Sequence, residues 1–361
     1  MTQKQCTVCR LPEAYPGISF DEQGVCSVCR RTIAPEKPYL GLDALKKRIA
    51  AVLSAPQYAK RPYDAAIAFS GGRDSSYLLY YAKQVLGLKV LAITLSHTFM
   101  PDETFESIEN ICRTLNVDLH VIKNEALDQY STQCVQAWAR KPEAATLVTF
   151  CTGCRYGIKR LIPSFCKEVG IPLLLVGNTR MEQMSYRQDL LSIDQRYPTM
   201  PNKAVGYLRS ILQNPGILGT PRCACVQAYE FAYPLARKVI KNKHVTVLAP
   251  FLDYEEVSEE HLTNTLHEIG WRHNACFKSE WRADCYVNIL RQYFYQKILG
   301  FSDLDVHYAD LLRAGEIDLP TAIGRRAAEN QFDKTLIADL LKTYYQLDLQ
   351  EILAKLPAKQ A

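Results

Sequence analysis

A short apolar run that ends in two glycines constrains the fold of this chain more than any other feature. Residues 65–69 are suited to a buried strand, Gly71 and Gly72 follow after Ser70, and a helical pattern begins at Ser75. A strand that ends in glycines at a helix N-terminus exposes several backbone N–H groups, and the helix dipole adds positive potential at the same point. The sequence therefore predicts a phosphate-binding loop directly after a buried strand.

The side chains of this loop are also suited to phosphate. Ser70, Ser75 and Ser76 can donate further hydrogen bonds, and the glycines let phosphates approach the backbone. Asp74 is an unusual neighbour for a polyphosphate unless it binds Mg²⁺ or caps the helix. The spacing of a Walker A loop, in which Lys follows the last glycine, is absent. A plain glycine turn between a strand and a helix is the alternative interpretation.

The string Ser-Gly-Gly-Arg-Asp-Ser-Ser at residues 70–76 resembles the Ser-Gly-Gly-x-Asp-Ser loop of the PP-loop ATP pyrophosphatases. Those enzymes cleave ATP to AMP and pyrophosphate while they adenylate a substrate. Many of them carry Lys where this chain has Arg73, a cation of different geometry. The resemblance implies that ATP and Mg²⁺ bind here and that Asp74 is catalytic. It assigns nucleotide binding to the loop and the neighbouring strand ends: Ala68, Phe69, Ser70, Gly71, Gly72, Arg73, Asp74, Ser75, Ser76, Thr94, Leu95, Gly177, Asn178 and Arg180.

Short apolar runs alternate with helical patterns along the middle of the chain. Strands are expected at residues 65–69, 90–95, 119–122, 173–176 and 245–248, separated by helices at 75–86, 104–115, 157–169 and 235–241. This alternation predicts an α/β fold with a doubly wound parallel sheet and a ligand at the carboxyl ends of the strands. Thr94 and Leu95 end the second strand, where the resemblance places adenosine. Asn178 and Arg180 follow the fourth strand, where they could instead be turn or surface residues.

The length of 361 residues allows two domains and an appendage. We expect a ribbon at residues 1–35, a PP-loop domain at 36–255 and a helical C-terminal region at 256–361. Residues 181–234 have an irregular pattern that indicates an inserted lid or substrate segment. In the C-terminal region, the group Trp281, Arg282 and Asp284 could face a ligand, or could be a helix cap beside a core tryptophan.

Composition favours a globular enzyme of the reducing cytosol. Hydrophobic residues make up 48% and charged residues 22% of the chain, and the net charge of +5 is weak evidence for a polyanionic partner. No signal peptide or membrane span is visible, so we expect a cytoplasmic protein with no membrane partner. The thirteen cysteines do not suit a secreted disulfide scaffold in a chain this long that carries an ATP loop.

Four of the cysteines have the spacing of a structural zinc site. Cys6 and Cys9 form one C-x2-C pair, and Cys26 and Cys29 form a second. The turn-rich segment between the pairs, with a short strand expected at residues 18–20, cannot bury much apolar surface, so the metal would supply its folding energy. Zn²⁺ is the predicted ion, and an iron cluster or free thiols are the alternatives. The segment also resembles the start of the N-acetyl sugar amidotransferases of bacterial surface-sugar synthesis, a resemblance that extends through the phosphate loop.

A third C-x2-C pair, Cys151 and Cys154, stands at the expected start of a helix, where thiols ionise more readily. Cys223 or Cys225 offers a third thiolate. A C-x2-C pair with one distant cysteine resembles the tRNA thiolases, in which three cysteines hold a [4Fe-4S] cluster and leave one iron free to carry sulfur. The resemblance implies catalytic roles for Cys151, Cys154 and Cys223. A persulfide or disulfide pair, a second zinc site and inert thiols remain alternatives. Cys276 and Cys285 could also be metal ligands, but their spacing is not diagnostic.

The two resemblances imply two reactions with a common first step. In the first, ATP adenylates a carbonyl oxygen of a tRNA base or a small nucleotide, and sulfur from a donor such as a cysteine desulfurase displaces AMP. In the second, ammonia from a partner glutaminase displaces AMP from an N-acetyl sugar. Because ammonia transfer needs no thiolate, the cysteines favour the first reaction. His97 and His273 could serve as acid–base groups but are as readily structural. A homodimer is compatible with either reaction.

Overall fold

The computed structural model describes residues 4–31, 38–180, 184–239 and 244–357. A parallel five-stranded sheet forms its α/β part, in the order β3-β2-β1-β4-β5. The predicted fold class is therefore confirmed, and the strands lie close to their expected positions: β1 Ala65–Ala68, β2 Val90–Ser96, β3 Asp118–Lys123, β4 Leu173–Leu175 and β5 Thr246–Leu248.

The strand order places the phosphate loop at the switch point of the sheet. From the central strand β1 the chain adds β2 and β3 on one side, and it later adds β4 and β5 on the other. Ligands of open α/β sheets bind outside the carboxyl ends of the strands at such a point. The loop that follows β1 opens into this position.

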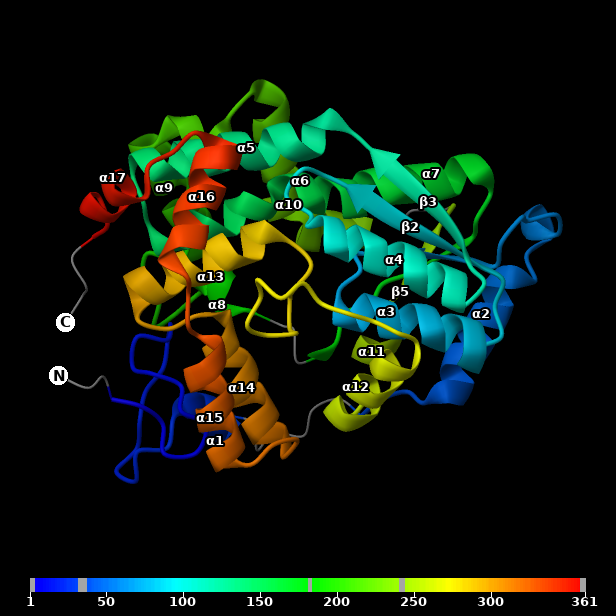
Figure 1. The fold of residues 1–361 in the computed structure, drawn as a ribbon, viewed down its shortest axis with the longest axis horizontal. Helices are drawn as coiled ribbons and strands as arrows, with labels where there is room; N and C mark the ends of the chain where they lie inside the picture. Colours follow the sequence, from blue (N-terminus) through cyan, green and yellow to red (C-terminus); the bar gives the residue numbers. More distant parts are fainter. Residues whose placement is uncertain (1–3, 32–37, 181–183, 240–243, 358–361) are drawn as a thin grey trace.

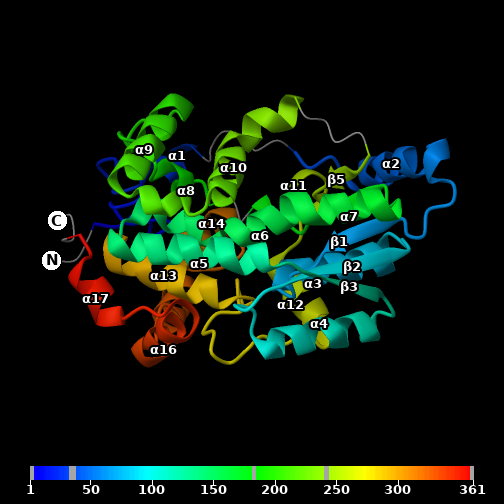
Figure 2. The same ribbon diagram turned by 90° about the horizontal axis from the view of Figure 1, so that it is seen from above.

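Helices cover both faces of the sheet because side chains alternate along each strand (Figure 2). Ala65 and Ile67 of β1 face helices α2, α3, α4 and α12, whereas Ala66 faces α5 and α7. The bounds of these helices are α2 Leu42–Leu53, α3 Arg73–Tyr80, α4 Asp102–Thr114, α5 Glu125–Arg140, α7 Ile162–Val169 and α12 Glu259–Glu268.

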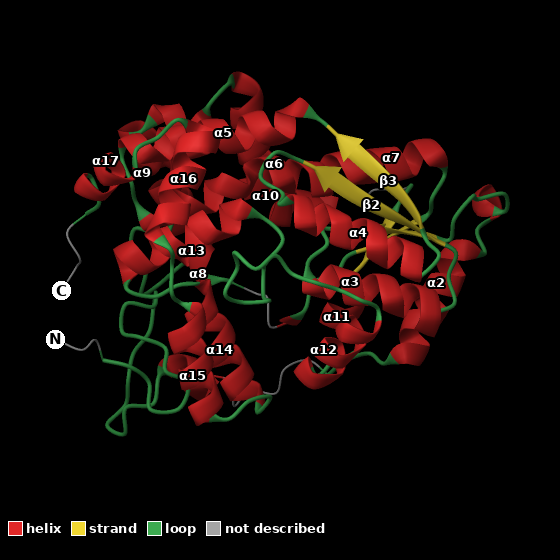
Figure 3. Ribbon diagram, in the orientation of Figure 1, coloured by secondary structure: helices red, strands yellow, loops and turns green. Residues whose placement is uncertain are grey.

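The remainder of the described chain is largely helical, as Figure 3 shows. Its helices are α1 Ser27–Arg31, α6 Thr152–Tyr156, α8 Tyr186–Asp189, α9 Met200–Gln213, α10 Pro221–Val239, α11 Pro250–Asp253, α13 Tyr286–Leu299, α14 Asp303–Ala314, α15 Leu319–Glu329, α16 Lys334–Tyr345 and α17 Leu349–Ala354. Short 3₁₀ or π segments also occur in the described chain: η1 Pro56–Tyr58, η2 Tyr81–Val85, η3 Ala144–Cys151, η4 Gly157–Leu161 and η6 Pro215–Leu218. None of the described helices has the length and hydropathy needed to span a lipid bilayer.

Three details of the sequence prediction were wrong. The segment 181–234, expected to be irregular, forms α8, α9 and the first part of α10 where it is described. The 16-residue helix α5 was not predicted, although the side chain of Asn124 caps it by accepting a hydrogen bond from the backbone N of Ala126. The strand expected at residues 18–20 does not form, and an isolated bridge between Phe20 and Cys26 stands in its place. The end of the helix expected at 235–241 lies partly outside the described residues.

The N-terminal ribbon packs on the C-terminal helices. Figure 1 shows the blue N-terminal segment beside α14 and α15. Cys6, Cys9 and Leu11 share one buried core with residues of α13, α14 and α16, and Arg326 of α15 donates a hydrogen bond of 3.4 Å to the backbone O of Arg10. The ribbon is therefore built into the largest core of the molecule. The domain boundaries expected at 35/36 and 255/256 stay predictions.

Candidate functional site

The loop after β1 has the shape that phosphate binding requires. Gly71 has a φ of +79°, and a Cβ at this position would lie 2.7 Å from Ile108, so only glycine fits without strain. Gly72 is the N-cap of α3. Ser70 Oγ accepts a hydrogen bond from Gly72 N at 3.2 Å, and Ser75 Oγ donates to Gly72 O at 3.0 Å. The predicted serines therefore hold the loop in shape around the N-terminus of α3.

The two charged residues of the loop, Arg73 and Asp74, form an ion pair with each other, and Arg73 also pairs with a residue of α12. Arg73 is almost fully buried and forms ion pairs with Asp74, at 3.4 Å, and with Glu259. The cation that the sequence offered to phosphate is thus partly neutralised by two carboxylates. Asp74 is among the residues that line the cavity described next, and a carboxylate is a ligand type that Mg²⁺ prefers.

A cavity of about 410 Å³ opens over the carboxyl ends of the strands. One wall is the phosphate loop with the ends of β2 and β4, and the opposite wall comes from α6 and from the segment that leads into α13. The predicted nucleotide residues that line it are Ala68, Phe69, Ser70, Gly72, Arg73, Asp74, Ser75, Leu95, Gly177 and Asn178.

Four residues assigned to the nucleotide site are not among those that line the cavity. The backbone O of Gly71 accepts from Trp271 Nε1 at 2.9 Å. Ser76 is buried and donates to Gly72 O, and Thr94 is buried and donates to Phe69 O at 2.8 Å. Arg180 donates to Leu252 O at 3.0 Å and lies 3.6 Å from the centre of the Tyr39 ring. These residues support the loop and the strand ends from behind.

The C-x2-C pair reaches the cavity from the end of η3 and from α6. Cys151 and Cys154 both line the cavity, as the sequence predicted. A Cβ at Gly153 would lie 1.9 Å from Leu127 O, so this residue between the two cysteines must be glycine for α6 to pack against α5. Leu127 also lines the cavity. The close packing of α5 and α6 therefore fixes where the two thiols lie.

The third cysteine in the cavity is Cys285, which sequence reasoning did not select. It is the N-cap of α13 and lines the cavity with its neighbours Arg282, Asp284 and Asn288. A Cβ built on Gly72 would lie 3.2 Å from Asp284 Oδ2, so this segment stands directly against the phosphate loop. Of the polar–aromatic group noted in the sequence, Arg282 and Asp284 face the cavity, whereas Trp281 is buried and stacks on His307.

Cys223 and Cys225 are not among the residues that line the cavity. Cys223 is fully buried with its Sγ 4.0 Å from that of Cys134, and Gln227 Nε2 donates to both sulfurs. The hydrogen bond from Cys134 and that from Gln227 lower the pKa of Cys223 to about 7, although burial opposes this. Cys225 is exposed. The cysteine that lines the cavity with Cys151 and Cys154 is therefore Cys285.

Burial keeps two of the three cavity cysteines, Cys154 and Cys285, in the protonated thiol form. Burial raises the pKa of Cys154 to about 12, helped by Cys151 and Asp284. Burial likewise raises the pKa of Cys285 well above its ordinary value, with Asp284 and Cys151 adding to the effect. A metal that binds here must displace these protons. His97 also lines the cavity; burial lowers its pKa, so it is neutral, and its buried Nδ1 has no hydrogen-bond partner among the described residues.

A buried ion network stands behind the cysteine wall. Asp303 is fully buried and accepts a hydrogen bond of 2.9 Å from Arg187 Nε, and its carboxylate also pairs with Arg291. Burial opposes ionisation of Asp303, but Arg187 and Arg291 outweigh it and lower its pKa. Removing one partner of such a buried pair typically costs about 3–5 kcal/mol. The network therefore fixes this wall of the cavity.

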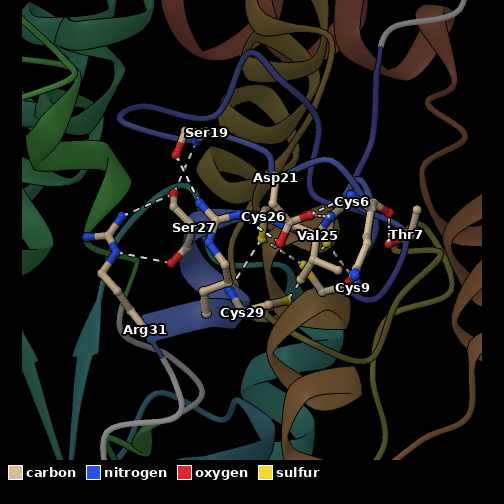
Figure 4. Close-up of polar contacts among 12 residues, drawn as sticks. Cys6, Thr7, Cys9, Ser19, Asp21, Val25, Cys26, Ser27, Cys29 and Arg31 are labelled. Atoms are coloured by element: carbon tan, nitrogen blue, oxygen red, sulfur yellow. Dashed lines mark hydrogen bonds and ion pairs between the residues drawn. The ribbon is translucent and has the colours of Figure 1, made fainter.

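The four ribbon cysteines form a compact group (Figure 4). All four sulfurs lie within 4.8 Å of one another, with Cys6 and Cys29 3.8 Å apart and Cys9 and Cys26 3.7 Å apart. A tetrahedral site with Zn–S bonds of about 2.3 Å needs sulfurs about 3.8 Å apart, so the group fits one metal ion and is consistent with a zinc ribbon. Among the described residues, no other set of three or more such side chains is this compact.

Comparison with known proteins places the phosphate loop in a family. Residues 43–185 match the family model of the PP-loop domain. The uncharacterised protein MJ1599 of Methanocaldococcus jannaschii is 24% identical over 127 residues, which are 35% of this chain and 45% of that protein. The match thus spans a little under half of the curated relative's own length.

Two solved structures show a distant likeness over most of the chain. The U34-tRNA thiolase NcsA of Methanococcus maripaludis, solved with its [4Fe-4S] cluster, is 14% identical with a TM-score of 0.35 over 96% of this chain and 100% of that one. The NMN synthetase of Francisella tularensis is 9% identical with a TM-score of 0.39 over 88% of this chain and 98% of that one. At these TM-scores neither likeness supports a conclusion about the reaction. The family model and the loop geometry agree that residues 43–185 form a PP-loop domain.

Proposed function

We propose that this protein is an ATP-dependent sulfurtransferase that replaces a carbonyl oxygen of a nucleobase-type acceptor with sulfur. One observation carries the proposal: Cys151, Cys154 and Cys285 line the same cavity as the PP-loop. Activation by ATP alone would not call for three thiols beside the loop. The acceptor class, tRNA or a small nucleotide, and the sulfur donor, such as a cysteine desulfurase, are part of the proposal.

The donor set of the cavity fits an iron–sulfur cluster. Three thiols from two separate segments converge on one cavity, and the arginines Arg187, Arg282 and Arg291 line it with them. Thiolate ligands bring negative charge into a buried site, and nearby guanidinium groups offset it. Cys151, Cys154 and Cys285 would hold a [4Fe-4S] cluster. Bound there, the cluster supplies an iron without a protein ligand, on which sulfur can be carried.

In the proposed reaction, the phosphate loop serves the activation by ATP, and the cavity cysteines serve the transfer of sulfur. The backbone N–H groups at the N-terminus of α3 would hold the phosphates, and Asp74 would position Mg²⁺ on them. The acceptor oxygen attacks the α-phosphorus, and pyrophosphate leaves. Sulfur then forms a bond to the acceptor carbon on the cysteine wall, and the C–O bond breaks to release AMP. The apolar side chains Leu95 and Leu127, together with Phe150, line the same cavity and would limit hydrolysis of the adenylate.

The first test uses Cys151→Ala beside the wild-type protein, both purified without oxygen. Each receives ATP, Mg²⁺ and radiolabelled sulfide, with bulk tRNA in one arm and a mixture of nucleotides in another. We expect wild-type protein to incorporate label in one arm. The C151A variant should bind ATP with unchanged affinity and incorporate none, because the loop that binds ATP lies on the other wall.

A parallel arm tests ammonia transfer to an N-acetyl sugar nucleotide with labelled ammonium. Nitrogen transfer by both proteins, with no sulfur incorporation by either, would contradict the proposal and favour an amidotransferase. Sulfur incorporation by C151A at the wild-type rate would contradict the role of the cavity cysteines.

A further inference from the structure

The sulfur of Cys151 has a charged hydrogen-bond donor that no motif in the sequence indicates. Arg291, from the second turn of α13, places its Nη1 2.7 Å from Cys151 Sγ. The arginine is only 2% exposed, so this contact is shielded from water. Hydrogen bonds that involve an ionised group are roughly twice as strong as neutral ones. The guanidinium is thus the most direct protein partner of this sulfur among the described contacts.

The other side of the guanidinium is held by groups that leave it little freedom. Its Nη2 donates to Asn288 Oδ1 at 2.8 Å and pairs with Asp303 Oδ2 at 3.4 Å. Asp303 is in turn held by Arg187 and by the hydroxyl group of Tyr186. Nη1 of Arg291 therefore points to Cys151 because its other nitrogen is fixed from behind.

The charges of this network also suit a metal-bound cysteine. Two buried guanidinium groups, those of Arg187 and Arg291, share the single carboxylate of Asp303. A buried charge without compensation is costly. A metal-bound cysteine is a thiolate, so Cys151 as a metal ligand would bring a second negative charge beside these two cations.

The network also reaches the phosphate loop. Asn288, which accepts from Arg291, donates through Nδ2 to Asp284 Oδ1 at 3.1 Å. Asp284 stands against Gly72. A chain of polar contacts therefore runs from the sulfur of Cys151 to Asp284, which lies beside the phosphate loop.

We propose that Arg291 is the positioning residue of the sulfur site, which holds Cys151 as a metal ligand and tunes the bound cluster through its N–H···S bond. This inference rests on the proposed function. A hydrogen bond to a ligand sulfur draws electron density from it, which stabilises the reduced cluster and makes its reduction potential less negative. It also orients the ligand, and loss of such outer partners commonly costs about 10- to 100-fold in metal affinity or activity.

The experiment compares the full-length wild type with Arg291→Met, Arg291→Lys and a control, Arg326→Lys. Arg326 forms an ion pair with Asp305 at 2.5 Å in the same helical region but does not line the cavity. Each protein is reconstituted with iron and sulfide without oxygen. The rate of iron loss to a ferrous chelator and the midpoint potential from an EPR-monitored redox titration are then measured.

We expect R291M to lose iron about 10- to 100-fold faster than the wild type and to have a more negative potential. R291K, which keeps the charge but lacks the planar fork, should fall between the two, and R326K should match the wild type. If R291M does not fold, the iron loss and midpoint potential of R291K, compared with the wild type, test the inference on their own. Wild-type iron loss and potential in the Arg291 variants would overturn this inference alone. A wild-type protein that takes up no iron would overturn the cluster, and with it both this inference and the proposed function.

Discussion

The chain contains two groups of cysteines that differ in how their members are brought together. The ribbon group, Cys6, Cys9, Cys26 and Cys29, lies within one short segment, and its four sulfurs already stand at the spacing of a single metal ion. In the cavity group, Cys151 and Cys154 share a segment, whereas Cys285 comes from the start of α13, far along the chain. The first group is local and compact, and the second is assembled by the tertiary fold.

This difference explains why spacing predicts one group and fails for the other. A C-x2-C pair repeated nearby specifies its own geometry, because the turn between the pairs brings all four sulfurs together. A third ligand supplied by a distant segment has no spacing rule. Cys223 and Cys225 were candidates because a C-x2-C pair with one distant cysteine resembles the tRNA thiolases, yet neither lines the cavity, and the sulfur of Cys223 lies 4.0 Å from that of Cys134.

The largest effect is expected from a test of which residue, Cys285 or Cys223, supplies the third cysteine of the cavity group. Cys285→Ser should abolish sulfur transfer and remove most of the iron, because it deletes one of three cavity thiols. Cys223→Ser should retain both, since its sulfur meets Cys134 and Gln227 instead. Iron and acid-labile sulfide are measured on both variants after purification without oxygen. Iron lost in C223S but kept in C285S would restore the ligand set expected from the sequence.

A second variant tests whether the phosphate loop acts independently of the cavity cysteines. Asp74→Asn should slow magnesium-dependent pyrophosphate release about 100-fold, the scale on which loss of one electrostatic contact acts in many active sites. Its iron content should equal that of the wild type, because Asp74 lies on the loop and contacts Arg73. Pyrophosphate release at the wild-type rate would remove Asp74 from the site.

A third variant tests whether the ribbon group is purely structural. Cys26→Ser should lose about one zinc per chain and become sensitive to proteolysis near its N-terminus, because so small a segment depends on its metal for folding. The cavity iron should remain, since Cys26 and the cavity belong to separate ligand sets. Metal analysis and limited proteolysis check both outcomes. Loss of iron together with zinc would show that the two groups are not independent.

The fold was largely predictable from the sequence because its signals are local. The apolar run at β1, the glycines at 71 and 72 and the alternation of strands with helices each depend on neighbouring residues, and the parallel sheet is confirmed. The loop also predicted the end of the sheet at which the cavity lies. Helix α5 was missed because its apolar residues face two different cores, with Leu127 in one and Trp138 in another, which blurs a single apolar stripe.

The second wall of the cavity could not be predicted because it depends on long-range packing. Asp284 reaches Gly72, and Arg291 reaches Cys151, only after α13 has packed against η3. The signal available in the sequence was an arginine among large apolar residues, since Arg291 stands among Leu290, Tyr293 and Phe294. Such a residue is rarely buried without a partner.

The central claim is that the cavity cysteines hold iron and the ribbon cysteines hold zinc. Anomalous diffraction from crystals grown without oxygen, recorded on both sides of the iron and zinc absorption edges, tests it most directly. We predict an iron peak in the cavity beside Cys151, Cys154 and Cys285, and a zinc peak among the four ribbon sulfurs. An iron peak at the ribbon with none in the cavity would contradict this assignment of the two metals.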